Sequence, residues 1–434
     1  MSFKIKITFV LIITVCFSAF SQLKNKPELN EAFMDMGFGI FIHWSLDSQL
    51  GSVISHSMVG ASEDYVKRYM EELPKTFYPD KFDPDEWARL FKLTGAEYVV
   101  FTTKHHNGFC MWDTKTTDFN IMNTPYGKDI TAELFTALRK HGLKVGVYFS
   151  PEDFSFLNKQ GELISRNSMM SQITENVELL EYDKKQVKEL VTNYGQIDVI
   201  FFDAFKTGPI VQYVHSLDPN IVVTRGEMKT PEQKIPDGAM PGPWETCMTM
   251  GTQWAYKPTN EVYKSGKELI NKLIEIRAKG GNFLMNVGPK PNGEIPIEQE
   301  ERLREIALWM FMNNESVKNV RTLPNVIKEG DLWFTKAKDE NTVYVFVPNE
   351  QEWFKGKRRL FYTEKLRTTK ETEISVLGQN DLVVEYSPNN IPTSRFTQRN
   401  HNVEISITRA QRVYNDKIWP NKVVVKLTNI EFVE

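Results

Sequence analysis

Short apolar stretches alternate with amphipathic stretches over roughly the first three quarters of this 434-residue chain. The apolar runs predict strands buried on both faces, as in a parallel sheet that is covered by helices; they lie at 38–43, 97–103, 143–150, 197–203, 220–225 and 282–288. The amphipathic stretches predict helices; the main ones lie at 83–95, 129–142, 181–195, 264–281 and 297–315. Asp83 and Asp129 stand where a capping side chain would begin two of these helices.

Repeated strand-then-helix units favour an α/β fold with a (β/α)8-like, TIM-type barrel over residues 22–322. No glycine-rich phosphate-binding motif follows the first strand, which argues against a doubly wound nucleotide-binding sheet. Residues 323–434 carry only short strand-like runs separated by turn residues, so we expect a C-terminal antiparallel β-sandwich there. The polar stretch 388–402 is expected to be a loop within that sandwich.

Residues 1–21 have the pattern of a signal peptide. Lys4 and Lys6 precede an apolar run at 7–17, and Ala19 and Ser21 supply the small residues of an expected cleavage site just before Gln22. The run is too short to cross a bilayer and no second long apolar stretch follows, so we expect no membrane span. The predicted location is the periplasm or the extracellular space, or the lysosome if the source is eukaryotic.

The net charge argues against a nucleic-acid partner, and the cysteine content argues against a fold held by disulfides. The formal net charge is −3, with no basic cluster, so no nucleic-acid partner is predicted. Beyond the signal peptide only Cys110 and Cys247 remain, which excludes a disulfide framework and predicts two buried thiols, with a single bridge as the alternative.

Candidate catalytic side chains gather where the predicted strands end. They are His43, His105, His106, Asp203 and Arg225, with Glu245 shortly afterwards in "GPWETCMTMG". Because the carboxyl ends of parallel barrel strands meet at one rim, we expect these groups to lie together. Two carboxylates on one rim suit glycoside hydrolysis, and imidazoles can hydrogen-bond to the hydroxyls of a sugar.

The histidines would also suit a metal-dependent hydrolase, the main alternative at this point. The first strand offers only one histidine, however, and His105 and His106 are adjacent. Adjacent side chains on an extended segment point to opposite sides, so both could reach one ligand only after a backbone bend. We therefore predict neither a metal nor a cofactor.

Five segments stand out along the chain, in this order: "FGIFIHWSL", "EYVVFTTKHHNGFCMWDTKTTDFN", "DVIFFDAF", "GPWETCMTMGTQWAYKP" and "KGGNFLMNVGPKPNGEIP". They resemble, in order, the signature segments of family 29 glycoside hydrolases, the retaining α-L-fucosidases. The resemblance runs from about residue 34 to 320, and the β-rich tail is similar in position and length to the C-terminal β-sandwich of that family.

The resemblance implies a role for each matching residue. Asp203 would be the nucleophile and Glu245 the acid/base, with Glu63 as the alternative acid/base. The residues implied to hold the fucosyl unit are His43, His105, His106 and Arg225, with Trp44 and Trp112 as apolar walls. The role of His56 is left open.

The implied activity is that of an exo-acting retaining α-L-fucosidase that releases terminal α-L-fucosyl residues from fucosylated oligosaccharides or glycoconjugates. A non-catalytic fucose-binding relative and a hydrolase of a related L-sugar, such as an α-L-galactoside, are the alternatives.

Overall fold

The computed structural model describes residues 23–348, 353, 356–384, 387–409 and 421–433. The predicted signal peptide and its cleavage site lie outside the described residues. No helix in the part that the structure describes is long and apolar enough to cross a bilayer.

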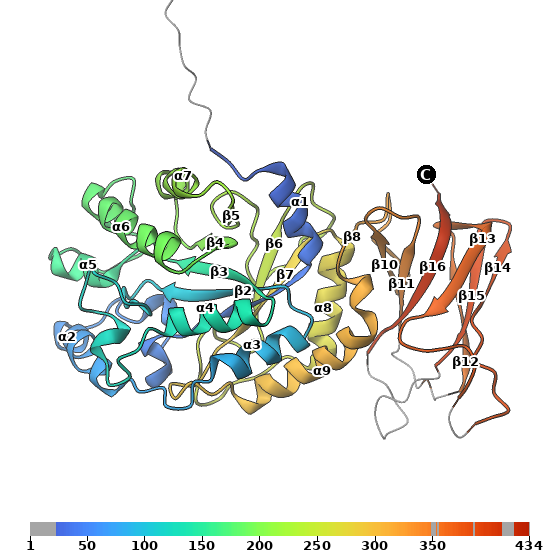
Figure 1. Cartoon of the computed structure of the whole chain (residues 1–434), viewed down its shortest axis with the longest axis horizontal. Coiled ribbons are helices and arrows are strands. Elements are labelled where there is room, and N and C mark those ends of the chain that lie inside the picture. Colours follow the sequence, from blue (N-terminus) through green and yellow to red (C-terminus); the bar gives the residue numbers. More distant parts are fainter. Residues whose placement is uncertain (1–22, 349–352, 354–355, 385–386, 410–420, 434) are drawn as a thin grey trace, which may run out of the picture.

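A curled parallel sheet forms the centre of the larger part, and its strand order is β5-β4-β3-β2-β1-β7-β6 (Figure 1). Its strands are β1 (Phe38–Ile42), β2 (Tyr98–Lys104), β3 (Lys144–Phe149), β4 (Val199–Phe202), β5 (Val222–Val223), β6 (Glu245–Thr249) and β7 (Asn282–Val287). Apart from the exposed first residue of β3, every residue of these strands is buried, which explains their continuous apolar runs.

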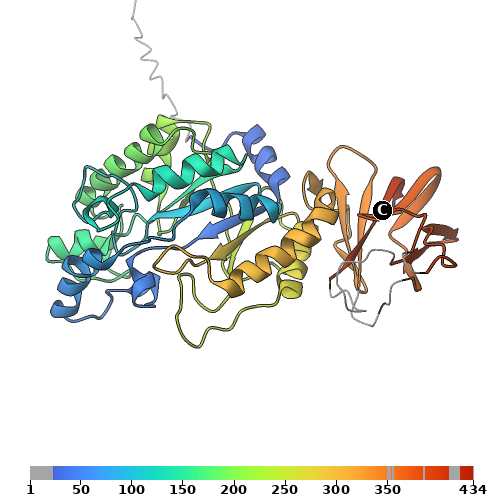
Figure 2. The ribbon, with the colours of Figure 1, turned by 60° about the horizontal axis from the view of Figure 1, so that its bottom comes forward.

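Helices pack around the outside of this sheet, as Figures 1 and 2 show. They are α1 (Pro27–Met36), α2 (Glu63–Glu71), α3 (Pro84–Leu93), α4 (Ile130–Lys140), α5 (Phe154–Lys159), α6 (Val177–Asn193), α7 (Gly208–Leu217), α8 (Gly266–Ala278) and α9 (Ile297–Asn313). The side chains of Asp83 and Asp129 accept hydrogen bonds from the N–H groups of Glu86 and Ala132, so both predicted caps are confirmed.

The strand β6 was not predicted from the sequence, which left 243–250 without an assigned element. Segment 229–232 runs beside this strand through parallel bridges from Lys229 to Trp244 and from Glu232 to Cys247. These bridges fill the gap between β5 and β6, so an irregular segment takes the place of a regular strand there. The TIM-like barrel is therefore confirmed, as a curled sheet of seven parallel strands within the described residues.

Two antiparallel sheets follow, as predicted, and both views place them beside α8 and α9 (Figures 1 and 2). The first contains β8 (Val320–Arg321), β9 (Lys328–Glu329), β10 (Leu332–Ala337), β11 (Val343–Val347), β13 (Leu366–Val376) and β16 (Val423–Phe432). The second contains β12 (Arg358–Thr363), β14 (Arg395–Arg399) and β15 (Asn402–Thr408).

The expectation that 388–402 is a loop was wrong in part, because β14 lies within it and pairs with β15. Its sequence, "RFTQR", alternates between exposed and half-buried positions and carries little apolar signal. The two parts of the chain pack together through Trp309 of α9, which stacks on Phe346 and donates its indole N–H to the carbonyl of Lys422.

Candidate active site

Asp203 follows β4 directly and is held by donors on both of its carboxylate oxygens. Arg225 donates from Nη1 to Oδ1 at 2.9 Å, and the hydroxyl of Tyr148 donates to Oδ2 at 2.8 Å. Burial alone would raise the pKa of Asp203, but His106, Arg225 and Arg166 outweigh it and hold the pKa well below its usual range. The side chain is 17% exposed, so Asp203 is an ionised carboxylate that a ligand can still reach.

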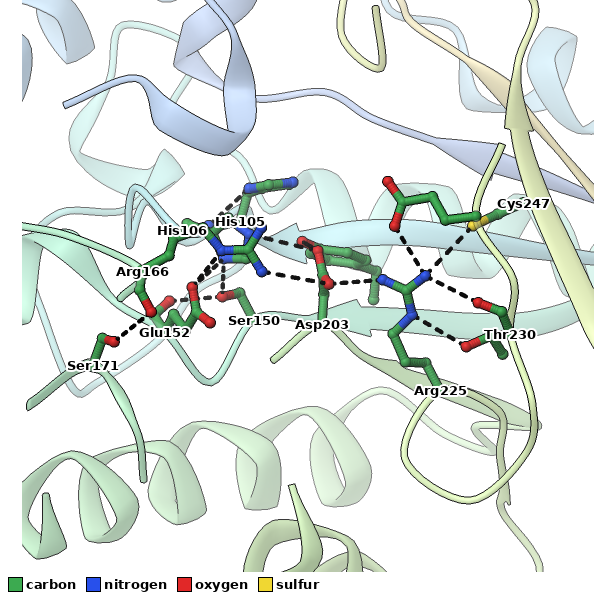
Figure 3. Close-up of polar contacts among 12 residues, drawn as sticks. His105, His106, Ser150, Glu152, Arg166, Ser171, Asp203, Arg225, Thr230 and Cys247 are labelled. Carbon is green, nitrogen blue, oxygen red and sulfur yellow. Dashed lines mark hydrogen bonds and ion pairs between the residues drawn. The ribbon is translucent and has the colours of Figure 1, made fainter. Parts of the chain in front are cut away.

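His105 and His106 both lie beside Asp203, because the chain bends at the end of β2. The pairing of β2 with β3 shifts register between Thr102 and Lys104, and the N–H of Gly108 closes a turn onto the carbonyl of His105. Figure 3 shows the two rings side by side to one side of Asp203. The bend required by two adjacent histidines is therefore present.

The three histidines of the site are neutral and offer different atoms to a ligand. Burial lowers the pKa of His43 to about 4 and that of His106 to about 3, and it lowers the pKa of His105 well below the ordinary value. His105 accepts the N–H of His106 at Nδ1, so the neutral ring carries its proton on Nε2. His43 donates from Nδ1 to Asn286, which leaves its Nε2 as an acceptor.

The Nε2 atom of His106 is buried, has no hydrogen-bond partner among the described residues and lies 3.5 Å from Oδ2 of Asp203. Trp254 packs beside His43, with the two ring centroids 4.8 Å apart. His56 is exposed and ends the short 3-10 helix Ile54–His56. A pocket of neutral imidazoles beside an aromatic ring suits the hydroxyls and apolar faces of a sugar.

Glu232 is a second carboxylate that Arg225 joins to Asp203, and sequence reasoning missed it. Arg225 donates from Nη2 to Oε2 of Glu232 at 3.0 Å. Its Nη1 holds Asp203, as Figure 3 shows. A pair of carboxylates on one rim is the arrangement that glycoside hydrolases use. Glu232 is 44% exposed, so it can also meet a leaving group. Its position in the irregular segment beside β6 left no strand-end pattern to find it by.

Glu152 and Arg166 form a second charged pair beside Asp203, also missed from the sequence. Arg166 donates from Nε to Glu152 at 2.7 Å, and its Nη2 lies 3.9 Å from Oδ1 of Asp203. Burial raises the pKa of Glu152 to about 7, against the opposing effect of Arg166. Both residues come from the chain after β3, and no regular pattern in the sequence marks them.

Glu245 does not lie at the rim, which corrects its predicted position. It is the first residue of β6 and fully buried, and its Oε2 accepts the hydroxyl of Tyr98 at 2.5 Å. Tyr98 begins β2 and packs on Phe33 of α1, at the amino-terminal end of the sheet. Cys247 lies two residues, or roughly 7 Å, further along β6 toward its carboxyl end. The Sγ atom of Cys247 contacts Nη2 of Arg225. Burial raises the pKa of Glu245 to about 7.

The side chains of Trp44 and Trp112 are fully buried and contact other side chains of the protein interior. The ring of Trp44 packs on Phe77, Phe82 and Trp87, so it is a core residue. Trp112 donates its indole N–H to Glu189 of α6 at 3.1 Å. The structure thus gives neither tryptophan the place of a pocket wall.

Glu63 lies at the start of α2 and lines a separate cavity of about 1020 Å³, together with Met70, Lys159 and Leu163. Among the contacts of the described residues, none links Glu63 to Asp203. Cys110 and Cys247 are both free and buried, which agrees with the predicted thiols.

A metal ion could be held by His105, His106 and Asp203, judged by residue type and distance alone. One ligand atom from each residue lies within 4.8 Å of the others. Asp203 is already engaged by Arg225 and Tyr148, however. The guanidinium groups of Arg225 and Arg166 would repel a cation, so the charges around this site favour a neutral ligand over a metal.

A buried ion cluster supports the end of β2, just before the histidines. Nζ of Lys104 lies 2.9 Å from Asp183 and 3.2 Å from Asp153, and none of the three side chains is exposed. Replacing Lys104 with methionine leaves two buried carboxylates without their cation. We expect a loss of about 3–5 kcal/mol in the free energy of unfolding, measured by urea denaturation.

The matched control is Lys81→Met, which breaks the largely exposed pair of Lys81 with Glu294. That change should cost no more than about 1 kcal/mol. Equal losses for the two variants would contradict a structural role for the Lys104 cluster.

A curled parallel barrel whose rim holds two carboxylates, joined by one arginine and faced by neutral histidines, defines a glycoside hydrolase site. Comparison with known proteins agrees. The family model for alpha-L-fucosidase matches residues 17–315, and the chain therefore belongs to the α-L-fucosidase family of glycoside hydrolases.

Individual relatives match most of the chain. It is 28% identical over 411 residues to the plasma α-L-fucosidase of Rattus norvegicus, covering 82% of this chain and 84% of that one. It is 29% identical over 375 residues to the α-L-fucosidase of Dictyostelium discoideum, covering 75% and 79%. The structure of α-L-fucosidase isoenzyme 1 from Paenibacillus thiaminolyticus matches with a TM-score of 0.73 at 26% identity, covering 92% of this chain and 98% of that one.

Proposed function

We propose that the protein is an exo-acting retaining α-L-fucosidase in which Asp203 is the nucleophile and Glu232 is the general acid/base. The observation that carries this proposal is the single guanidinium of Arg225 that holds both carboxylates. The substrate class is a fucosylated oligosaccharide or glycoconjugate with a terminal α-L-fucosyl residue.

Each side chain has a task in a double displacement. Asp203, kept ionised by its cationic neighbours, attacks the anomeric carbon, while protonated Glu232 gives its proton to the departing glycosidic oxygen. Glu232 then takes a proton from water, which displaces Asp203 from the glycosyl-enzyme. Arg225 orients both carboxylates, and it still balances the charge of Glu232 when Asp203 is esterified.

The histidines supply recognition of the sugar. His105 can donate from Nε2 to a ring hydroxyl, while Nε2 of His43 can accept one. Because all three rings are neutral, the hydrogen bonds do not add charge beside the developing oxocarbenium ion. Trp254 offers an apolar face next to His43, which suits the methyl-bearing side of a deoxy-sugar.

Release of L-fucose from a panel of α1,2-, α1,3-, α1,4- and α1,6-linked fucosyl oligosaccharides, with 4-nitrophenyl α-L-fucoside beside them, tests this proposal. We expect hydrolysis of the aryl fucoside and of at least one linkage, with the α-anomer of fucose as the first product seen by NMR. The β-anomer as first product would contradict retention.

Three further arms of the same assay address the alternatives. Faster hydrolysis of an aryl α-L-galactoside would favour the related L-sugar, although a pocket that merely tolerates an added hydroxyl discriminates modestly. Fucose binding without turnover would favour a non-catalytic relative. We expect full activity after EDTA treatment, because arginines surround Asp203; a loss that added metal restores would favour the metal-dependent alternative.

We also propose export of the protein through its signal peptide. The support is the sequence pattern of residues 1–21. Amino-terminal sequencing of the mature protein, with Gln22 expected as its first residue, tests it.

A further inference from the structure

Arg166 is a cation in the pocket with hydrogen-bonding capacity to spare. Its Nε is bonded to Glu152, and no other side-chain hydrogen bond from Arg166 is recorded among the described residues. Its Nη2 is 3.9 Å from Oδ1 of Asp203, which is too long for a hydrogen bond. The side chain is 25% exposed, whereas that of Glu152 is only 2% exposed. The outer edge of the guanidinium therefore has free donors and is open to solvent.

The position of Arg166 is fixed from two directions. Its backbone carbonyl accepts the hydroxyl of Ser171 at 3.1 Å, and its guanidinium is held by the buried carboxylate of Glu152. Glu152 is tied in turn to the histidines, because its carbonyl accepts the hydroxyl of Ser150, which also contacts Nδ1 of His106 at 2.5 Å. An arginine anchored in this way loses little entropy when it binds a ligand.

The two arginines of the site stand on opposite sides of Asp203, as Figure 3 shows. Arg225 is committed to Asp203, Glu232 and the carbonyl of Thr230. Arg166 stands on the histidine side. A sugar ring with its anomeric carbon at Asp203 and its leaving group at Glu232 extends its ring hydroxyls toward the histidine side, where the free N–H groups of Arg166 are.

We infer that Arg166 binds a ring hydroxyl of the fucosyl unit and that Glu152 is the positioning residue that holds Arg166 for this contact. The inference rests on the proposed function. It adds Arg166 as a hydrogen-bond donor to the sugar and Glu152 as the carboxylate that positions Arg166. It assigns to the Glu152–Arg166 pair the recognition of a neutral polyol, since Glu152 balances the charge of Arg166.

The test compares native protein, Arg166→Met and Arg166→Lys on 4-nitrophenyl α-L-fucoside and on its 2-, 3- and 4-deoxy analogues. On the parent fucoside, kcat/KM should fall about 10- to 100-fold in Arg166→Met, the range for a hydrogen bond from a charged donor. Arg166→Lys should lose less. On the one analogue that lacks the bound hydroxyl, Arg166→Met should change kcat/KM by no more than about twofold.

The inference would be overturned if Arg166→Met lost as much kcat/KM on all three deoxy analogues as on the parent fucoside. It would also be overturned if Arg166→Met left kcat/KM on the parent fucoside unchanged. The control is Arg304→Met, which removes an exposed arginine of α9 that pairs with Glu300, and it should leave every rate unchanged. Thermal unfolding of each variant separates a failure to fold from a loss of recognition, and Arg166→Lys provides the comparison if Arg166→Met is unfolded.

A double-mutant cycle tests the role of Glu152. Glu152→Gln should lower kcat/KM less than Arg166→Met does, and the double variant should be no worse than Arg166→Met alone. Losses that multiply would show that Glu152 acts independently of Arg166. If native protein does not hydrolyse the parent fucoside, the proposed function fails; calorimetric binding of L-fucose and its deoxy analogues to the same variants then decides the inference by itself.

Discussion

Asp203→Gly is expected to lower kcat for 4-nitrophenyl α-L-fucoside by about 10³- to 10⁵-fold. The reason is that Asp203 is the ionised carboxylate on which the neighbouring donors converge, with Arg225 and Tyr148 both bonded to it. Without it no glycosyl-enzyme forms, and water must displace the leaving group without a covalent step. Steady-state kinetics of purified native protein and variant give the comparison.

Azide provides the sharper readout for this variant. It fits the space that the carboxylate leaves, attacks the anomeric carbon from the same face and should release β-L-fucosyl azide while the nitrophenolate departs. Asp198→Ala is a suitable control, because Asp198 precedes β4 and pairs with Lys144 away from the pocket. Full activity in Asp203→Gly, or azide rescue that yields the α-azide, would contradict the role of Asp203.

Glu232→Gln is expected to lower kcat/KM for a fucosyl oligosaccharide by about 10²- to 10⁴-fold, the range for general acid catalysis. The loss of kcat/KM for an aryl fucoside should be much smaller, because nitrophenolate departs without a proton. This dependence on the leaving group distinguishes a general acid from a residue that only supports the pocket. The same pair of substrates, assayed side by side, measures it.

Glu245→Gln is the matched comparison, since it makes the same chemical change at the other candidate. Glu245 is buried against Tyr98 at the start of β6, so the change should act on stability and affect both substrates alike. A leaving-group-dependent loss in Glu245→Gln, with none in Glu232→Gln, would restore the role that the sequence resemblance implies for Glu245.

Much of the site could be found from the sequence because strand ends are visible there. The strands that end at Ile42, Lys104 and Phe202 are buried strands of one parallel sheet, so the residues that follow them had to meet at one rim. His105 and His106 needed a bend at the end of their strand, and the turn that Gly108 closes provides it.

The errors have a common physical origin in side-chain direction and irregular backbone. "ETCMT" has too few apolar residues to indicate a strand, yet all five positions are buried within the barrel. Because this strand was not predicted, Glu245 was placed at the rim, whereas it lies at the amino-terminal end of β6. Trp44 and Trp112 lie close to site residues in the chain, but each points into the core.

The sequence by itself determined the parallel barrel, the β-rich tail and the strand-end positions of Asp203 and the histidine pair, because all of these follow from local periodicity and from where each strand ends. The role of Asp203 as nucleophile was implied only by the family resemblance. Only the tertiary structure decided which second carboxylate stands beside Asp203. That choice depends on the guanidinium of Arg225, which bonds both Asp203 and Glu232, although Glu232 lies in an irregular segment. A contact of this kind leaves no local pattern in the sequence.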